Sequence, residues 1–135
     1  MKIADIEGIG PAWAKKLGDA GVKTTDALLK FGGTKKARQA LADKTGLAHA
    51  QILEWVNRAD LYRIKGVGSE YSDLLERAGV DTVVELANRN AANLYKAVKD
   101  LVGKTGTKVV RRIPSEKEIT SWVTQAKKLP RAVEY

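Results

Sequence analysis

One glycine-rich turn combines residue types that could bind a phosphate group. In the stretch IEGIGPAWAKKLGDAGV, the turn is formed by Gly8, Ile9 and Gly10, and Lys15 and Lys16 follow shortly after it. Glycine permits a tight turn, and a helix that starts there directs its unpaired N–H groups and the positive end of its dipole toward one point. A phosphate oxygen fits that arrangement, and the lysines add charge. The chemistry that these residue types allow is the binding of a phosphate group.

A second turn of the same kind occurs in IKGVGSEYSDLLERAGV, but carboxylates surround it. Lys65, Gly66 and Gly68 are candidate phosphate contacts by analogy with the first turn. However, Asp73 takes the place that a lysine has in the first copy, and Glu76 follows it. Carboxylates in the first turns of a helix stabilise its dipole and repel phosphate. We therefore predict that the second turn is mainly a structural joint between two helices.

Two further stretches, KFGGTKKARQ and GKTGTKVVRR, concentrate the basic excess of the chain. The sequence has 24 basic and 16 acidic side chains, a net charge of +8. Positions 1–60 contribute +3, positions 61–100 contribute zero and positions 101–135 contribute +5. Such a balance favours a polyanionic partner, although solvated lysine faces also occur in proteins that bind no nucleic acid. The candidate contacts in these stretches are Lys35, Lys36, Arg38, Lys104, Lys108, Arg111 and Arg112.

The chain repeats one unit twice. A shift of 58 positions aligns the two glycine turns and the two later Gly-Val pairs, which start at Gly21 and Gly79. Further along, ILEWVNRA matches ITSWVTQA at a shift of 67, so the second copy carries an insertion. Repetition at a fixed period indicates a repeated structural unit. We predict a first unit over 1–60 and a second over 61–135, with a basic insertion at about 104–113.

The elements that position the turns are predicted to be helices. Apolar residues after each turn recur at intervals of three and four, the spacing of one helical face. They are Trp13, Leu17 and Ala20 in the first copy and Tyr71, Leu75 and Ala78 in the second. Because Trp13 and Tyr71 are equivalent, packing is favoured for them over stacking on bases. The glycine that follows each helix suits a left-handed C-terminal cap.

Polar residues predict where the other helices begin. Thr34 and Asn90 suit the N-caps of helices that run to about positions 43 and 102. Thr82 with Glu85, and Ser115 with Glu118, have the spacing of capping boxes, and the last helix should stop before Pro130. A helix over about 48–64 would direct Ile52, Trp55, Val56 and Leu61 inward, and Trp122 would be its core counterpart. The most extended segment expected is 108–113, a basic loop or short strand.

The two turns, taken with their helices, resemble the helix-hairpin-helix family of nucleic-acid-binding motifs. The matching residues are Ile6, Gly8, Ile9, Gly10, Ala14, Leu17, Ala20, Gly21 and Val22, then Ile64, Gly66, Val67, Gly68, Leu75, Ala78, Gly79 and Val80. Overall the chain is similar to small bacterial proteins of unassigned function with two such units. The resemblance implies an all-α fold of duplicated helix-hairpin-helix units, of the SAM-like type, packed into one compact body. It also implies binding to a nucleic-acid backbone without sequence preference.

The sequence departs from the family at positions that bear on function. Ser72 replaces a small alanine, and the places after the second glycine that often hold Lys or Arg are Ala12, Trp13, Glu70 and Tyr71. The separation of 58 residues also exceeds that of hairpin pairs that straddle a duplex, so a symmetric clamp is not expected. DNA is the preferred partner and RNA a weaker possibility. The alternative is a protein-interaction module that uses Trp13, Tyr71 or the acidic 70–76 face.

Other function classes find little support in the sequence. There is no cysteine and a single histidine, His49, so neither a thiolate nor a His-rich metal site is expected, and no cofactor is implied. Gly103-Lys104-Thr105 lacks the earlier glycine of a P-loop, since that position is Val98. No paired carboxylates or nucleophile–base pair suggest an enzyme. No apolar stretch approaches the roughly 18 residues of a membrane span, and we expect a cytoplasmic protein.

Overall fold

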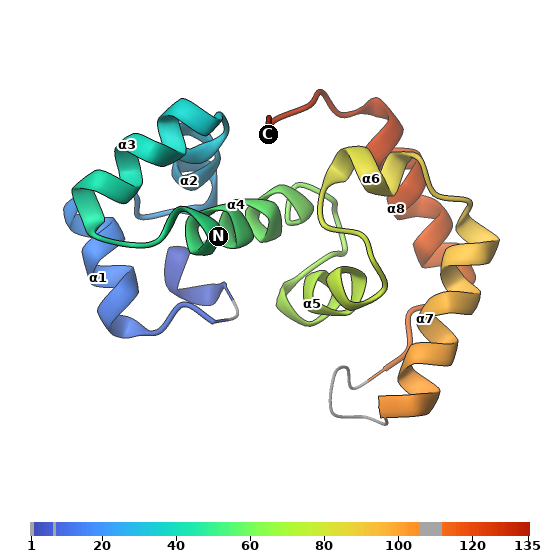
Figure 1. Cartoon of the computed structure of the whole chain (residues 1–135). Helices are drawn as coiled ribbons and strands as arrows, with labels where there is room; N and C mark the ends of the chain where they lie inside the picture. The colour runs from blue at the N-terminus through green and yellow to red at the C-terminus, as the bar shows by residue number, and fades with distance from the viewer. Residues whose placement is uncertain (1, 7, 106–111) are drawn as a thin grey trace. The chain divides into compact units, whose positions relative to one another are not determined.

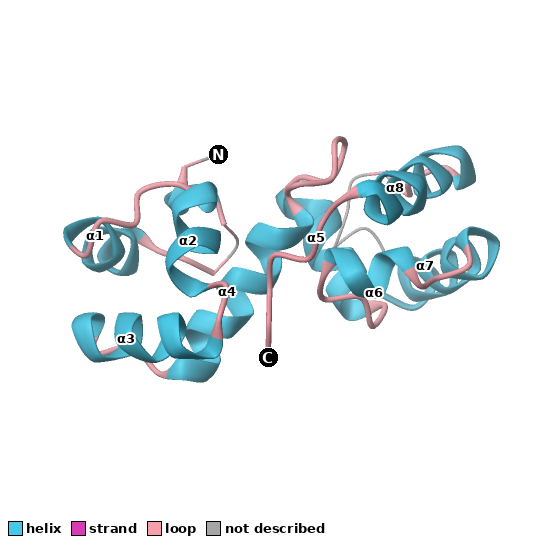
Figure 2. Ribbon diagram, turned by 90° about the horizontal axis from the view of Figure 1, so that it is seen from above, coloured by secondary structure: helices cyan, strands magenta, loops and turns pink. Residues whose placement is uncertain are grey.

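The computed structural model of the chain is all-helical over the residues it describes, which are 2–6, 8–105 and 112–135 (Figures 1 and 2). This agrees with the all-α class predicted from the sequence. The only extended pairing in these ranges is an isolated antiparallel bridge between Lys2 and Thr24. The helices are η1 (Ile3–Asp5), α1 (Pro11–Asp19), α2 (Thr25–Gly32), α3 (Lys35–Thr45), α4 (His49–Leu61), α5 (Ser69–Arg77), α6 (Val83–Ala87), α7 (Ala91–Thr105) and α8 (Glu116–Lys128).

The helices form two compact units. The first consists of Met1–Asp60 together with Arg131–Tyr135, and the second of Leu61–Pro130. The C-terminal segment therefore belongs to the first unit, whereas the sequence repeat alone assigns it to the second. That the two units pack into one body remains a prediction, because it concerns their mutual placement.

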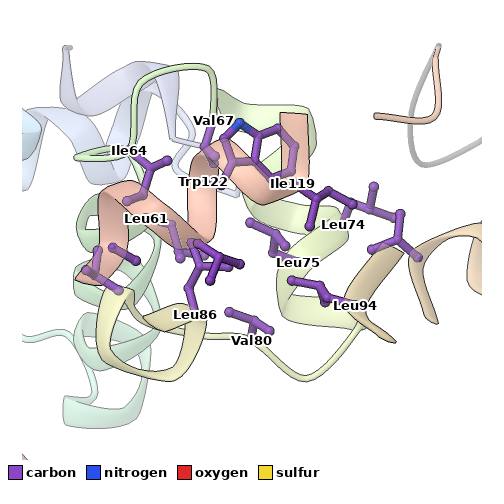
Figure 3. Packing of buried hydrophobic residues seen from close by; sticks show 14 of the residues in the cluster. Leu61, Ile64, Val67, Leu74, Leu75, Val80, Leu86, Leu94, Ile119 and Trp122 are labelled. Carbon is purple, nitrogen blue, oxygen red and sulfur yellow. The ribbon is translucent and has the colours of Figure 1, made fainter. Parts of the chain in front are cut away.

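Each unit is organised around one tryptophan of its closing helix. In the first unit, Trp55 of α4 is only 2% exposed, and Ile6, Leu17 and Leu28 from the preceding helices and turn are buried in the same unit. In the second unit, Trp122 of α8 is also 2% exposed and belongs to a cluster with Val67, Leu75 and Leu94 (Figure 3). The predicted core positions of both tryptophans are confirmed.

The helix that follows each glycine turn ends in the same way. The Val22 N–H donates to the Leu17 oxygen over 2.8 Å, and the Val80 N–H donates to the Leu75 oxygen over 2.8 Å. Gly21 and Gly79 lie between these partners with φ of +92° each, a left-handed conformation that disfavours a Cβ. The predicted C-terminal caps are confirmed, and the chain leaves both helices along the same local path.

Side chains cap the starts of five other helices, and the sequence predicts all of these caps except Thr24. The Thr34 hydroxyl accepts from the Ala37 N–H over 3.1 Å, and the Asn90 side chain accepts from the Asn93 N–H over 3.0 Å. Ser115 and Glu118 form a complete capping box at α8. Thr24 and Thr82 cap α2 and α6.

Two helix predictions need correction. The helix predicted over 48–64 ends at Leu61, because Gly66 requires a positive φ and the chain turns before it, with the Ile64 N–H bonded to the Leu61 oxygen. At α6, Glu85 does not complete a capping box on Thr82. Its carboxylate instead accepts from the N–H of Asp81 and the Thr82 hydroxyl. Most of the predicted basic strand, 108–111, lies outside the described residues, and residues 112 and 113 are not in a strand.

Candidate nucleic-acid interface

Buried isoleucines fix the first glycine turn to the body of the first unit. Ile6 and Ile9 are 2% and 5% exposed, and the Ile9 N–H donates to the Ile6 oxygen over 3.1 Å. Gly8, between them, has a φ of +90° and is itself exposed. Gly10 is the N-cap of α1, with an extended backbone that leads into Pro11. The apolar anchors thus hold the turn at the surface, directly before the start of the helix.

The start of α1 lacks the side-chain cap that α2, α3, α6, α7 and α8 have. Among the described residues, no side chain accepts a hydrogen bond from its first turn, and the same is true of α5, which follows the second glycine turn. The Ala14 N–H is bonded to the Gly10 oxygen, so the N–H groups of Ala12 and Trp13 are the ones left without an intrahelical acceptor. Such groups need an acceptor from solvent or from a ligand.

Exposed cationic and aromatic side chains lie on α1 beyond this turn. Lys15 and Lys16 are both exposed, and neither forms an ion pair among the residues that the structure describes. The Lys16 ammonium lies 4.9 Å from the centroid of the Trp13 ring, within the range of a cation–π contact. Trp13 is 40% exposed, so it does not pack in the interior, and packing at an interface with a partner stays a prediction. Its indole instead forms part of the surface.

The second turn has the same backbone form but different surroundings. Gly66 has a φ of +98°, and a Cβ there would lie 3.0 Å from the Trp122 indole nitrogen. The Gln125 side chain brackets Lys65, accepting from its N–H over 2.9 Å and donating to its carbonyl oxygen over 3.1 Å. Helix α8 therefore holds this turn through hydrogen bonds to both the N–H and the carbonyl oxygen of Lys65. Lys65 and Gly66 are the exposed residues of the turn.

Tyr71 differs from Trp13, its counterpart in the repeat. The Tyr71 ring packs on Trp122 with centroids 5.2 Å apart, and its hydroxyl donates to the Arg112 carbonyl oxygen over 3.2 Å. Burial raises the pKa of the Tyr71 hydroxyl above its ordinary value. The packing prediction is thus correct for Tyr71. Equivalent positions in the repeat have taken different roles.

The basic residues of α3 divide between surface and interior. Lys35 and Lys36 are exposed in the first turn of the helix. Arg38 is 1% exposed, and its guanidinium donates to the carbonyl oxygens of Gly32, Gly33 and Glu134 at 2.9, 3.0 and 2.5 Å. The prediction that Arg38 contacts phosphate is therefore wrong. Its charge is used to hold the C-terminal segment against the α2–α3 turn.

The predicted basic insertion offers fewer free cations than its sequence suggests. Lys104 is exposed at the end of α7, while Lys108 and Arg111 lie outside the described residues. Arg112 donates to both oxygens of Glu118, with Nη1–Oε1 at 2.6 Å and Nη2–Oε2 at 2.9 Å. The hydrogen bond from Arg112, with that from the Ser115 main chain, lowers the pKa of Glu118 from 4.5 to about 2. Arg112 is thus ion-paired within the protein, and its role as a phosphate contact stays a prediction.

A groove in the first unit was missed by the sequence analysis. A cavity of about 240 Å³ is bordered by the C-terminal end of α1, by α2 and by α3. Its lining is mostly apolar and includes Phe31, which is 44% exposed, together with Lys30 and Lys44. The exposed Phe31 between Lys30 and a Gly-Gly pair was the available signal. Its place on the amphipathic face of α2 concealed it.

Neither a metal centre nor a membrane helix is found in the described ranges. No group of three or more His, Asp or Glu side chains there is placed to hold a metal ion. None of the helices is long and apolar enough to cross a membrane.

Comparison with known proteins places the chain in one family. A family model described as "Domain of unknown function (DUF4332)" matches residues 7–129, which includes both glycine turns and all helices from α1 to α8. No curated protein and no solved structure matches the chain. The match covers nearly the whole sequence, and the chain therefore belongs to the DUF4332 family.

Proposed function

We propose that this protein binds the backbone of nucleic acid, DNA in preference to RNA, through its first glycine turn and without sequence preference. In this proposal the two glycine turns and their helices are helix-hairpin-helix units. The repeated hydrogen bonds at the turns and helix ends, at a shift of 58 residues, support that assignment. The protein acts as a binding module rather than as an enzyme.

The uncapped start of α1 beside exposed lysines is the observation that carries the proposal. The N–H groups of Ala12 and Trp13 have no intrahelical acceptor, and Gly8 and Gly10 themselves carry no side chain. Lys15 and Lys16 supply positive charge on the same helix. A phosphate group meets both needs, since it accepts hydrogen bonds and carries negative charge.

The second turn contributes mainly to structure in this proposal. Gln125 and Trp122 of α8 occupy its inner side, and carboxylates follow it along α5. The asymmetry between the turns implies one principal backbone contact per chain, supplemented by Lys35 and Lys36 of α3. If about four phosphates are neutralised, log affinity falls with log salt at a slope of about −3.6 on duplex DNA.

A salt titration with a matched pair of variants tests the proposal. Binding of a fluorescent duplex is measured by anisotropy for the native chain and for the double variant Lys15→Glu with Lys16→Glu. The control is Lys96→Glu with Lys99→Glu, which makes the same charge change at exposed positions of α7 in the second unit. We expect the first variant to bring the slope to about −1.8, the value for two phosphates, and the control to change it little.

Two results would contradict the proposal. One is the absence of salt-dependent binding in the native chain at low ionic strength. The other is an equal loss of affinity in both double variants, which would mean that net charge rather than the first turn governs binding. The first result would favour a protein-interaction module on the same helical scaffold.

A further inference from the structure

The groove of the first unit combines an apolar floor with a cationic border. Ala20 at the end of α1, Ala37, Ala40 and Leu41 of α3, and Phe31 of α2 line it. A second cavity of about 270 Å³ shares Ala20 and Lys44 with it and extends to Lys16. The two cavities are therefore neighbours, and Lys16, which lines the second, also forms the cation–π contact with Trp13.

Three lysines line these two cavities. Lys16, Lys30 and Lys44 come from three different helices, and Lys44 lines both cavities. None of them forms an ion pair with another described residue. The one carboxylate at the border is Asp19, next to Lys16. The ligand that complements such a border is a polyanion.

The apolar floor of the groove would fit a flat, apolar group on the same ligand. Trp13 and Phe31 are exposed aromatic rings, and each has a lysine ammonium nearby, at 4.9 Å for Trp13 and 5.7 Å for Phe31. Aromatic rings next to cations are the arrangement by which proteins hold unpaired bases while neutralising the adjoining phosphates. An apolar floor offers few hydrogen bonds to base edges, so the identity of the base would matter little.

We propose that this groove binds an unstacked base of a single nucleic-acid strand, with Phe31 as its stacking surface and Lys16, Lys30 and Lys44 beside the flanking phosphates. The inference rests on the proposed function, because the strand is held nearby at the first glycine turn. A cavity of about 240 Å³ is smaller than the roughly 300–1,000 Å³ of sites for drug-sized ligands, and thus suits a single ring system. In a duplex the bases are stacked within the helix, so only a single strand can supply one without cost.

The test compares strands that carry equal charge and differ only in their bases. Anisotropy measures the affinity of fluorescent dT12, of an abasic strand with the same number of phosphates, and of a duplex of the same sequence. We expect dT12 to bind the native chain roughly 5- to 150-fold more tightly than the abasic strand, the effect of one stacked base. Phe31→Ser and Ala40→Glu, both at exposed positions of the groove, should remove that preference. They should leave the fold intact by circular dichroism.

A matched control is available in the second unit. Ile113 is 38% exposed and does not line the groove, so Ile113→Ser removes a similarly exposed apolar side chain and should leave the preference unchanged. Equal affinity for dT12 and the abasic strand would overturn the inference, and so would an unchanged preference in Phe31→Ser. Binding of a fluorescent acidic amphipathic peptide that Phe31→Ser abolishes, without any base preference, would identify the groove as a protein-docking surface instead and overturn it too. Failure of the proposed function is distinct, since the abasic strand and the duplex would then show no salt-dependent binding.

Discussion

Arg112 and Glu118 form a two-pronged ion pair, with donor–acceptor distances of 2.6 and 2.9 Å, at the point where α8 begins. Glu118 also accepts from the Ser115 N–H over 3.1 Å, while the Ser115 hydroxyl accepts from the Glu118 N–H. The ion pair is thus built on a helix cap. It anchors the segment before α8. The carbonyl oxygen of Arg112, in that segment, accepts a hydrogen bond from the Tyr71 hydroxyl. A basic residue that the sequence offers to a partner is used here within the fold.

This ion pair makes the stability of the second unit dependent on acid pH. The pKa of Glu118 is lowered from 4.5 to about 2, so its contribution is complete above about pH 4.5 and is lost as the pH falls toward 2. Glu118→Gln keeps the length of the capping side chain and removes the charge. We expect the variant to show a flatter loss of stability between these pH values, measured by thermal melting. An unchanged pH profile in the variant would contradict the assignment of this pH dependence to Glu118.

The contact between Arg38 and the C-terminal segment should be energetically strong. Arg38→Met would leave the carbonyl groups of Gly32 and Glu134 without the guanidinium that they accept from, at a cost of about 3 kcal/mol. Deletion of 131–135 removes the same contact from the other side. Urea unfolding of both variants and their combination should reveal a coupling energy of about 1–3 kcal/mol. Strict additivity would show that the segment is held by other contacts.

The two glycine turns should respond differently to alanine. Both Gly8→Ala and Gly66→Ala place a Cβ at positive φ, which costs about 1–2 kcal/mol. At Gly66 the new Cβ would also lie 3.0 Å from the Trp122 indole nitrogen, against 3.9 Å from that of Trp55 at Gly8. Hydrogen exchange of each unit should therefore show a larger loss of stability for Gly66→Ala. Equal losses would mean that the indole moves without cost.

Trp13 provides a fluorescent probe of the proposed interface. Trp55 and Trp122 are 2% exposed each, whereas Trp13 is 40% exposed, so aqueous iodide should quench chiefly Trp13. Binding of a nucleic-acid strand at α1 should protect this fluorescence from iodide. Trp13→Leu should remove both the quenching and its protection. Protection that survives in this variant would place the ligand elsewhere.

Asp19 should weaken the binding of a polyanion, because its carboxylate stands at the border of the groove beside Lys16 and Lys44. Asp19→Asn removes one negative charge without changing the size of the side chain. We expect a gain in affinity of a few-fold at low salt, which disappears as salt screens the interaction. A reduced affinity would show that Asp19 supports the site.

The sequence predicted those features that depend on nearby residues. The caps at Gly21, Gly79, Thr34, Asn90 and Ser115 are all present, because each is made by groups within a few positions of one another. Arg38 could not be placed in this way. Its burial depends on Glu134, 96 positions away, and no local pattern records that contact.

The repeat was informative about backbone and less so about side chains. Leu17 and Leu75 are both fully buried, as their equivalence predicts. Trp13 and Tyr71 differ because Tyr71 has Trp122 and the Arg112 carbonyl as partners in the second unit, whereas Trp13 reaches solvent and Lys16. The groove depends on the packing of three helices, which periodicity within any one helix does not reveal.

The order of synthesis gives the C-terminal segment a role in folding. The ribosome completes residues 61–130 before it adds 131–135, which belong to the first unit. Arg38 of the first unit therefore lacks its last acceptor, the Glu134 carbonyl, until the whole of 61–130 has been made. The unit that begins first along the chain is thus the one whose contacts are completed last.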